Sequence, residues 1–260
     1  MIKFLELLSI EFSSEATAAT IGTKRDRLIK KITRNDDPYR ELKHHSNIQA
    51  LKMLPKARQF IKGRRRSYER FKAACIVSIL GNLIEFDIIG HEFDFKKLNR
   101  LFANTELTID DTRTIYNLLK HSKNVVLLAD NAGAIVFDVV LIDEIRHIGP
   151  SVTVAVKKEP ALNDATLIDA DELGMRRVAD VITTGTDTLG LLLEEASAEL
   201  KRKIRGCDLL VVKGMANYET LSDQRMSVPM AFLLMAKCDP IAIDLGVKKG
   251  SAVAKLVKPS

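Results

Sequence analysis

The chain has 260 residues, of which 46% are hydrophobic and 28% are charged, and its formal net charge is +6. This composition excludes a disordered chain, and no apolar run approaches the roughly 18 residues that a transmembrane helix needs. Three Cys residues without a CxxC spacing provide neither a disulfide framework nor a zinc cluster, so we expect a soluble cytoplasmic protein with reduced thiols.

The excess of basic residues lies in the first half of the chain. Over residues 1–120, Lys and Arg number 23 and Asp and Glu 15, a balance of +8. Over residues 121–260 the numbers are 17 and 19, a balance of −2. The two balances add to +6 and indicate two regions with different roles.

Apolar residues at three- and four-residue spacing predict that the first half is helical. Asp37 before Pro38 is typical of a helix start. The predicted helices cover residues 24–32, 39–60, 67–84, 94–102 and 110–119.

The pattern changes in the second half, where short runs of aliphatic and β-branched residues alternate with helical stretches. Predicted strands cover residues 124–129, 152–156, 178–183, 207–212, 231–236 and 252–257. Predicted helices cover residues 133–146 and 189–203, a third begins near residue 217 and a fourth ends near residue 246. This alternation favours an α/β fold with a mainly parallel sheet flanked by helices.

In an open parallel sheet, ligands bind beyond the carboxyl ends of the strands. Asp130 and Asn131 follow the first predicted strand, and Asp164 follows the second after a loop. Lys213 and Lys237 come directly after two later strands. We therefore expect these side chains to meet at one edge of the sheet.

Oxygen atoms from Asp130, Asn131 and Asp164 are the ligands that Mg²⁺ or Mn²⁺ prefers. Lys213 and Lys237 opposite such a metal would hold a phosphoryl group, so the set indicates metal-dependent phosphate chemistry. Taken singly, each residue has a simpler interpretation, because an Asp-Asn pair often forms a turn or cap and a Lys after a strand is often solvated. Their coincidence at strand ends favours the functional interpretation.

Other chemistries find less support in the residues. The segment Arg64-Arg65-Arg66 is a candidate nucleic-acid patch, but without interleaved aromatic residues a solvated helix surface is favoured. A single glycine after the first strand argues against a methyltransferase loop, and Ala132 stands where a haloacid-dehalogenase-type phosphatase has a second Asp.

Several segments together resemble the damage-control phosphatase family, formerly called domain of unknown function eighty-nine. The likeness runs from about Asp36 to Val257 and looks most like the compact stand-alone branch found in prokaryotes. The segments are DPYRELKHHSN at 37–47, GNLIEF at 81–86, LLADNAGAIVFD, LNDAT at 162–166, VVKGMANYETL and LLMAKCDPIA.

The resemblance implies a helical region packed on a Rossmann-like α/β domain, a divalent metal (Mn²⁺, Co²⁺, Ni²⁺ or Mg²⁺), and hydrolysis of small phosphate monoesters such as sugar phosphates or damaged phosphometabolites. We therefore expect an all-helical region at 1–122 and an α/β metal-binding catalytic domain at 123–260. The resemblance assigns metal binding to Asp130, Asn131 and Asp164, and catalysis to Asp130, Asp164 and Lys213. It assigns substrate binding to Lys213, Gly214, Asn217, Tyr218, Glu219 and Lys237. Asn82 and Asn47 are further candidates for the floor of the cleft.

The chain departs from the family pattern at a few positions. Ala134 replaces the usual Glu of the DNAGE motif, Glu85 replaces an Asp, and the N-terminal Cys pair is missing. Ala134 leaves a metal-binding pseudoenzyme as one alternative. Two others stay open: a carboxyl methyltransferase that uses S-adenosylmethionine, suggested by a human member of the family, and a nucleic-acid-binding protein that uses the basic half. Whether a water or Asp130 attacks the phosphorus is also open.

Overall fold

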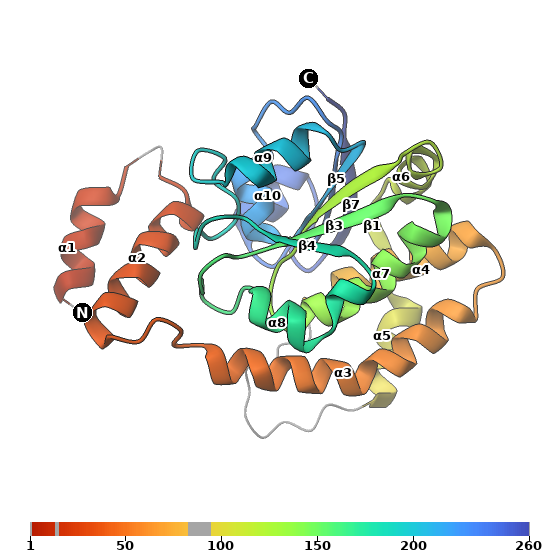
Figure 1. Cartoon of the computed structure of the whole chain (residues 1–260), viewed down its shortest axis with the longest axis horizontal. Coiled ribbons are helices and arrows are strands. Elements are labelled where there is room, and N and C mark those ends of the chain that lie inside the picture. Colours follow the sequence, from red (N-terminus) through yellow and green to blue (C-terminus); the bar gives the residue numbers. More distant parts are fainter. Residues whose placement is uncertain (1, 14–15, 83–94, 260) are drawn as a thin grey trace.

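A computed structural model describes residues 2–13, 16–82 and 95–259, and it is built around one twisted sheet (Figure 1). In this part of the chain the sheet has seven strands in the order β1-β7-β6-β5-β2-β3-β4. All neighbouring strands are parallel except β6 and β7, which are antiparallel. The strands are β1 (Leu107–Asp110), β2 (Asn124–Leu128), β3 (Ser151–Val156), β4 (Asp180–Thr183), β5 (Leu209–Lys213), β6 (Met230–Met235) and β7 (Ala252–Val257).

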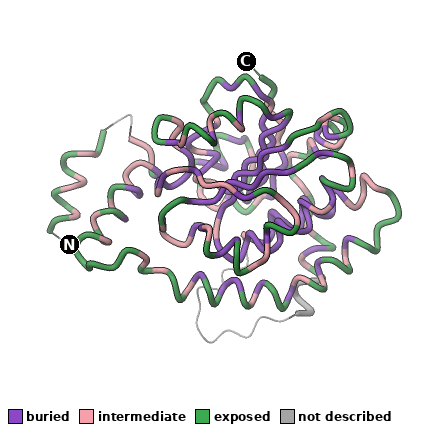
Figure 2. The backbone as a smooth tube through the Cα atoms, in the orientation of Figure 1, coloured by how far each residue is buried: buried purple, intermediate pink, exposed green. Residues whose placement is uncertain are grey.

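The central strands are continuous apolar runs because both faces of the sheet are covered. Successive side chains of a strand point to opposite faces. Leu127 thus belongs to a core shared with α3 (Arg40–Lys62), α4 (Ser67–Gly81) and α7 (Ala134–Ile148). Leu128 belongs to a second core, which lies beneath α9 (Ala198–Arg205), α10 (Met215–Leu221) and α11 (Asp239–Leu245). The buried positions run through the strands in the middle of the molecule (Figure 2).

The remaining helices lie around this framework. They are α1 (Ile2–Glu11), α2 (Ala18–Thr33), α5 (Phe95–Asn104), α6 (Thr112–Leu119), α8 (Leu167–Glu172), α9 (Ala198–Arg205), α10 (Met215–Leu221) and α11 (Asp239–Leu245). No helix in the ranges that the structure describes is long and apolar enough to cross a membrane.

Helix α2 is held against the loops that follow β3 and β4. Lys30 donates to the main-chain oxygen of Pro160 at 2.6 Å, and the Thr23 hydroxyl accepts from the Leu189 amide at 2.9 Å. Asp187 accepts from Arg27 at 2.6 Å and from Lys30 at 3.0 Å. A segment from the basic half of the chain is thereby fastened to the carboxyl edge of the sheet.

The predicted fold class is confirmed: the chain is α/β, with a mostly parallel sheet flanked by helices. The region expected to be all-helical also contains a strand, because β1 pairs with β7 at the sheet edge. The division at residue 122 stays a prediction, and the core around Leu127 includes residues from both sides of it.

The helix predicted over residues 189–203 is wrong in its first half, since α9 begins only at Ala198. Gly185 and Gly190 have φ values of +87° and +67°, and the Thr186 and Thr188 hydroxyls donate within the same segment. These local hydrogen bonds and left-handed backbone positions stabilise a loop in place of a helix.

Candidate active site

The loops that follow β2 and β3 are joined directly at the carboxyl edge of the sheet. Asn131 and Asp164 form an antiparallel bridge. The Ala132 amide donates to the main-chain oxygen of Asn163 at 2.8 Å, and the Ala165 amide donates to the main-chain oxygen of Asp130 at 2.9 Å. The predicted metal-binding residues, which are distant in sequence, are therefore brought together by backbone hydrogen bonds.

Asp130 and Asp164 are both buried, each with 7% of its surface exposed. Burial raises the pKa of Asp130 to about 7, and the nearby Asp164 carboxylate adds to this rise. Burial also raises the pKa of Asp164, against the opposing effect of the Lys157 ammonium 3.5 Å away. Two buried carboxylates that repel each other form a place that a divalent cation would stabilise.

Asn82, the residue that caps the C-terminus of α4, connects three of the predicted site residues. Its amide nitrogen donates to the Asp130 carboxylate, and its amide oxygen accepts from Asn131 Nδ2 at 3.1 Å. Lys237 Nζ donates to the main-chain oxygen of Asn82 and, at 3.1 Å, to its amide oxygen. The side-chain nitrogen of Asn131 is occupied by its hydrogen bond to Asn82. The side-chain oxygen of Asn131 is therefore the atom that can bind a cation.

Gly214 brings the end of β5 against the same carboxylate. Its φ is +81°, and a Cβ atom built on it would lie 2.2 Å from Asp130 Cγ. Asn217 holds the two strand ends together, since its amide nitrogen donates to the oxygens of Ala129 at 3.2 Å and Lys213 at 2.8 Å. In this structure the Asn217 amide thus supports the edge on which Asp130 lies.

Lys213 is almost completely buried, with 1% of its surface exposed. Its ammonium donates to Asp138 Oδ1 at 2.7 Å and to the main-chain oxygen of Ser78 at 3.0 Å. The two predicted lysines therefore differ: Lys237 contacts Asn82 at the site, whereas Lys213 lies beneath it and contacts α4 and α7.

Tyr218 and Glu219, predicted as substrate-binding, make their contacts away from Asp130. The Tyr218 hydroxyl donates to Asp244, and its ring lies edge-on to Phe232 with centroids 5.0 Å apart. Burial and this hydrogen bond raise the pKa of Tyr218. Glu219 accepts from the Ala19 amide at 3.2 Å and so helps to hold α2.

Some residues near the site were not selected from the sequence. Lys157 comes directly after β3, so the strand-end rule that selected Lys213 also applies to it. Its ammonium donates to the Gly190 oxygen at 2.5 Å and lies 3.5 Å from Asp164. Glu85, noted as a departure from the family motif, lies outside the described residues.

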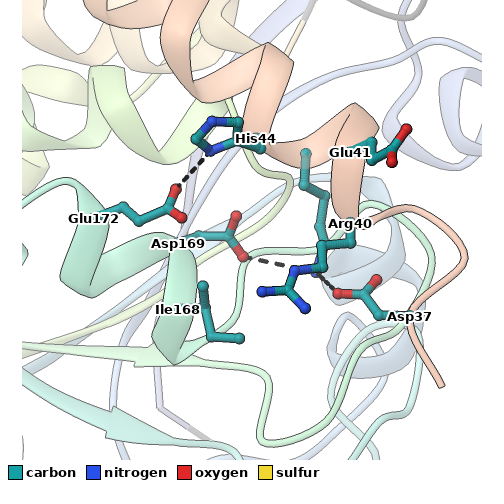
Figure 3. A pocket seen from close by; sticks show the side chains of 8 residues that line it. Asp37, Arg40, Glu41, His44, Ile168, Asp169 and Glu172 are labelled. Atoms are coloured by element: carbon teal, nitrogen blue, oxygen red, sulfur yellow. Dashed lines mark hydrogen bonds and ion pairs between the residues drawn. The ribbon is translucent and has the colours of Figure 1, made fainter.

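A pocket of about 460 Å³ opens between the start of α3 and helix α8 (Figure 3). Lys43 in its wall forms an ion pair with Asp37 at 2.9 Å and lies 3.8 Å from Asp169. Asn47 links this pocket to the candidate site. Its amide nitrogen donates to Asp169 at 2.8 Å, and its amide oxygen accepts from the main-chain amide of Gly133 at 2.8 Å. The pocket lining consists of Asp37, Arg40, Glu41, Lys43, His44, Ile168, Asp169 and Glu172.

The donor set fits a hard divalent cation. Among the residues that the structure describes, no three His, Cys, Asp or Glu side chains cluster closely enough to hold a metal. The predicted set instead combines two carboxylates, Asp130 and Asp164, with the amide oxygen of Asn131. Oxygen-only sets with few protein ligands suit cations that keep part of their coordination for water and substrate.

Comparison with known proteins places the chain among relatives of similar length. The family model for the damage-control phosphatase ARMT1-like domain matches residues 1–253. An uncharacterized protein of Methanocaldococcus jannaschii is 38% identical over 253 residues, which cover 96% of this chain and 83% of that protein. A damage-control phosphatase of Archaeoglobus fulgidus is 38% identical over 258 residues, which cover 98% and 88% of the two chains.

A solved structure supports the same relationship. The crystal structure of a protein of the domain-of-unknown-function-89 family from Pyrococcus horikoshii superposes with a TM-score of 0.86 at 32% sequence identity. The match covers 100% of this chain and 88% of the other.

Proposed function

Because the chain belongs to the damage-control phosphatase ARMT1-like domain family, we propose that it is a divalent-metal-dependent phosphatase of small phosphate monoesters. Sugar phosphates and damaged phosphorylated metabolites are the substrate class. Mn²⁺, Co²⁺, Ni²⁺ and Mg²⁺ are the candidate metals.

The observation that carries the proposal is the pair of buried carboxylates in the loops that follow β2 and β3. Asp130 and Asp164 lie on two loops joined by backbone hydrogen bonds, and burial raises the pKa of each. Keeping two acids buried side by side costs free energy unless a cation compensates them. Asn131 adds a neutral oxygen to the same edge of the sheet.

Each residue has a defined role in the proposed reaction. Asp130, Asn131 and Asp164 would hold the metal, and Asn82 orients Asp130 and Asn131 through its amide. A metal bound there supplies charge that polarises the phosphoryl oxygens. Lys237, which is partly buried beside Asn82, would neutralise charge that develops on the phosphoryl group.

The test is release of inorganic phosphate from a panel of phosphate monoesters with each of the four metals. Asp164→Asn removes one proposed metal-binding charge at nearly constant shape and should abolish turnover. Asp180→Asn is the matched control, because Asp180 is exposed at the opposite, amino end of β4. Wild-type turnover no higher than that of Asp164→Asn on every substrate would contradict the proposal.

A further inference from the structure

The conspicuous polar feature of the core is a buried ion pair beneath the candidate site. Lys213, at the end of β5, and Asp138, on α7, have 1% and 0% of their side chains exposed and lie 2.7 Å apart. The Ser78 hydroxyl donates to the same carboxylate oxygen of Asp138 at 2.6 Å. Within the described chain, the second oxygen of Asp138 has no hydrogen-bond partner.

The position of Lys213 in the chain places its charge close to Asp130. The next residue, Gly214, is in contact with the Asp130 carboxylate. The Lys213 ammonium is also close enough to interact electrostatically with the Asp130 carboxylate. Asp130 is thus the acidic group to which the Lys213 ammonium could turn if its present partner were removed.

A buried ammonium that loses its partner is strongly destabilised and takes another acceptor where one is in reach. If Lys213 paired with Asp130, its positive charge would occupy the carboxylate that the metal needs. Asp138 and the Ser78 oxygen hold the ammonium on the side of α4 and α7 instead.

We infer that Asp138 is a positioning residue that keeps Lys213 away from Asp130, so that Asp130 stays available to a divalent cation. This inference rests on the proposed function, since it assumes that Asp130 binds the metal. It also assigns Lys213 to the support of the site, below the surface on which a substrate would lie.

The experiment measures Mn²⁺ binding by titration calorimetry with the purified full chain, independently of turnover. Asp138→Asn keeps the shape but removes the charge, so it should weaken Mn²⁺ binding by about tenfold or more, as for other residues that support metal ligands. Replacing both members of the pair, with Lys213→Met added to Asp138→Asn, should bring Mn²⁺ binding back to within about threefold of wild type. Ser78→Ala is the matched control, because it removes a hydrogen bond to Asp138 but keeps the ion pair, and it should bind Mn²⁺ like wild type.

Each outcome bears on the inference. Unchanged Mn²⁺ binding by Asp138→Asn, or a double variant that binds no better than Asp138→Asn, would overturn it and leave the proposed function intact. If Asp138→Asn does not fold, the double variant alone carries the test, since loss of Mn²⁺ binding there would mean that the pair is needed for the metal itself. A wild-type protein that binds none of the four metals would contradict the proposed function and this inference together.

Discussion

Gly214 and Asp130 are in direct contact: the Cα of the glycine lies against the carboxylate, with no room for even one further carbon atom between them. The contact joins the ends of β5 and β2, two neighbouring parallel strands. A glycine is required here for two reasons, because the backbone has a φ of +81° and because a side chain would collide with a candidate metal ligand.

Gly214→Ala should therefore damage the site more than the fold. The added methyl group must displace the Asp130 carboxylate, and a shift of about 1 Å in a reacting group can reduce turnover by about 100-fold. The measurement is metal-dependent phosphate release, together with the thermal midpoint of unfolding. Gly246→Ala is the control, since Gly246 has a similar φ of +68° but no heavy atom of the described chain within 4 Å of the new Cβ. Equal turnover in the two variants would contradict this role of the contact.

Asn82→Ala should weaken metal binding and turnover without unfolding the protein. The change removes the donor to Asp130 and the acceptor for Asn131 and Lys237 in one step. Residues that orient metal ligands typically contribute roughly 10- to 100-fold to metal affinity or activity. Calorimetric titration with Mn²⁺ and a turnover assay test this. Gln49→Ala is the control, since the Gln49 amide contacts His45 and Lys52 of its own helix. Wild-type Mn²⁺ affinity in Asn82→Ala would show that Asn82 does not orient the ligands.

The stability of the metal-free protein should fall as the pH rises from about 4 to about 7. The pKa of Asp130 is about 7 in the folded state and 3.8 for an unperturbed Asp, so the folded state binds more protons across this interval. The raised pKa of Asp164 acts in the same direction. Above pH 7 the charge stays buried and the loss of stability persists.

Urea unfolding in the presence of a chelator, at pH values from 4 to 8, measures this effect. Asp130→Asn carries no titrating group at this position, so its stability advantage over wild type should grow with pH and reach its maximum above pH 7. Parallel profiles for the two proteins would contradict the raised pKa of Asp130.

Asp187→Asn should loosen α2 from the rest of the protein. The Asp187 carboxylate accepts from both Arg27 and Lys30, and the hydrogen bond with Arg27 contributes most to the raised pKa of that guanidinium. Removing the charge should accelerate amide hydrogen exchange in α2, while exchange in the central strands stays slow. Asp171→Asn removes an exposed ion pair with Arg176 and serves as the control. Identical exchange in α2 for both variants would show that Asp187 does not fasten the helix.

The sequence by itself determined the fold class and the main elements of the sheet. The apolar runs at β2, β3, β5 and β6 can be recognised without tertiary information, because a strand covered on both faces is apolar at every position. It also determined where Asp130, Asn131 and Asp164 lie, since the residues after parallel strands share one edge of the sheet. β1 was missed because its four residues alternate between half-buried and exposed positions at the sheet edge, which makes a weak pattern.

Only the tertiary structure decided which partner each polar side chain takes. Lys213 and Lys237 each follow an apolar run in the sequence, yet one is buried against Asp138 and the other contacts Asn82 at the site. Tyr218 and Glu219 directly follow Asn217 in the chain, but Tyr218 hydrogen-bonds to α11 and Glu219 to α2. The physical reason is that hydrogen bonds and ion pairs depend on distances of about 3 Å between groups far apart in the chain, and these distances are set by how α2, α4 and α7 pack around the sheet.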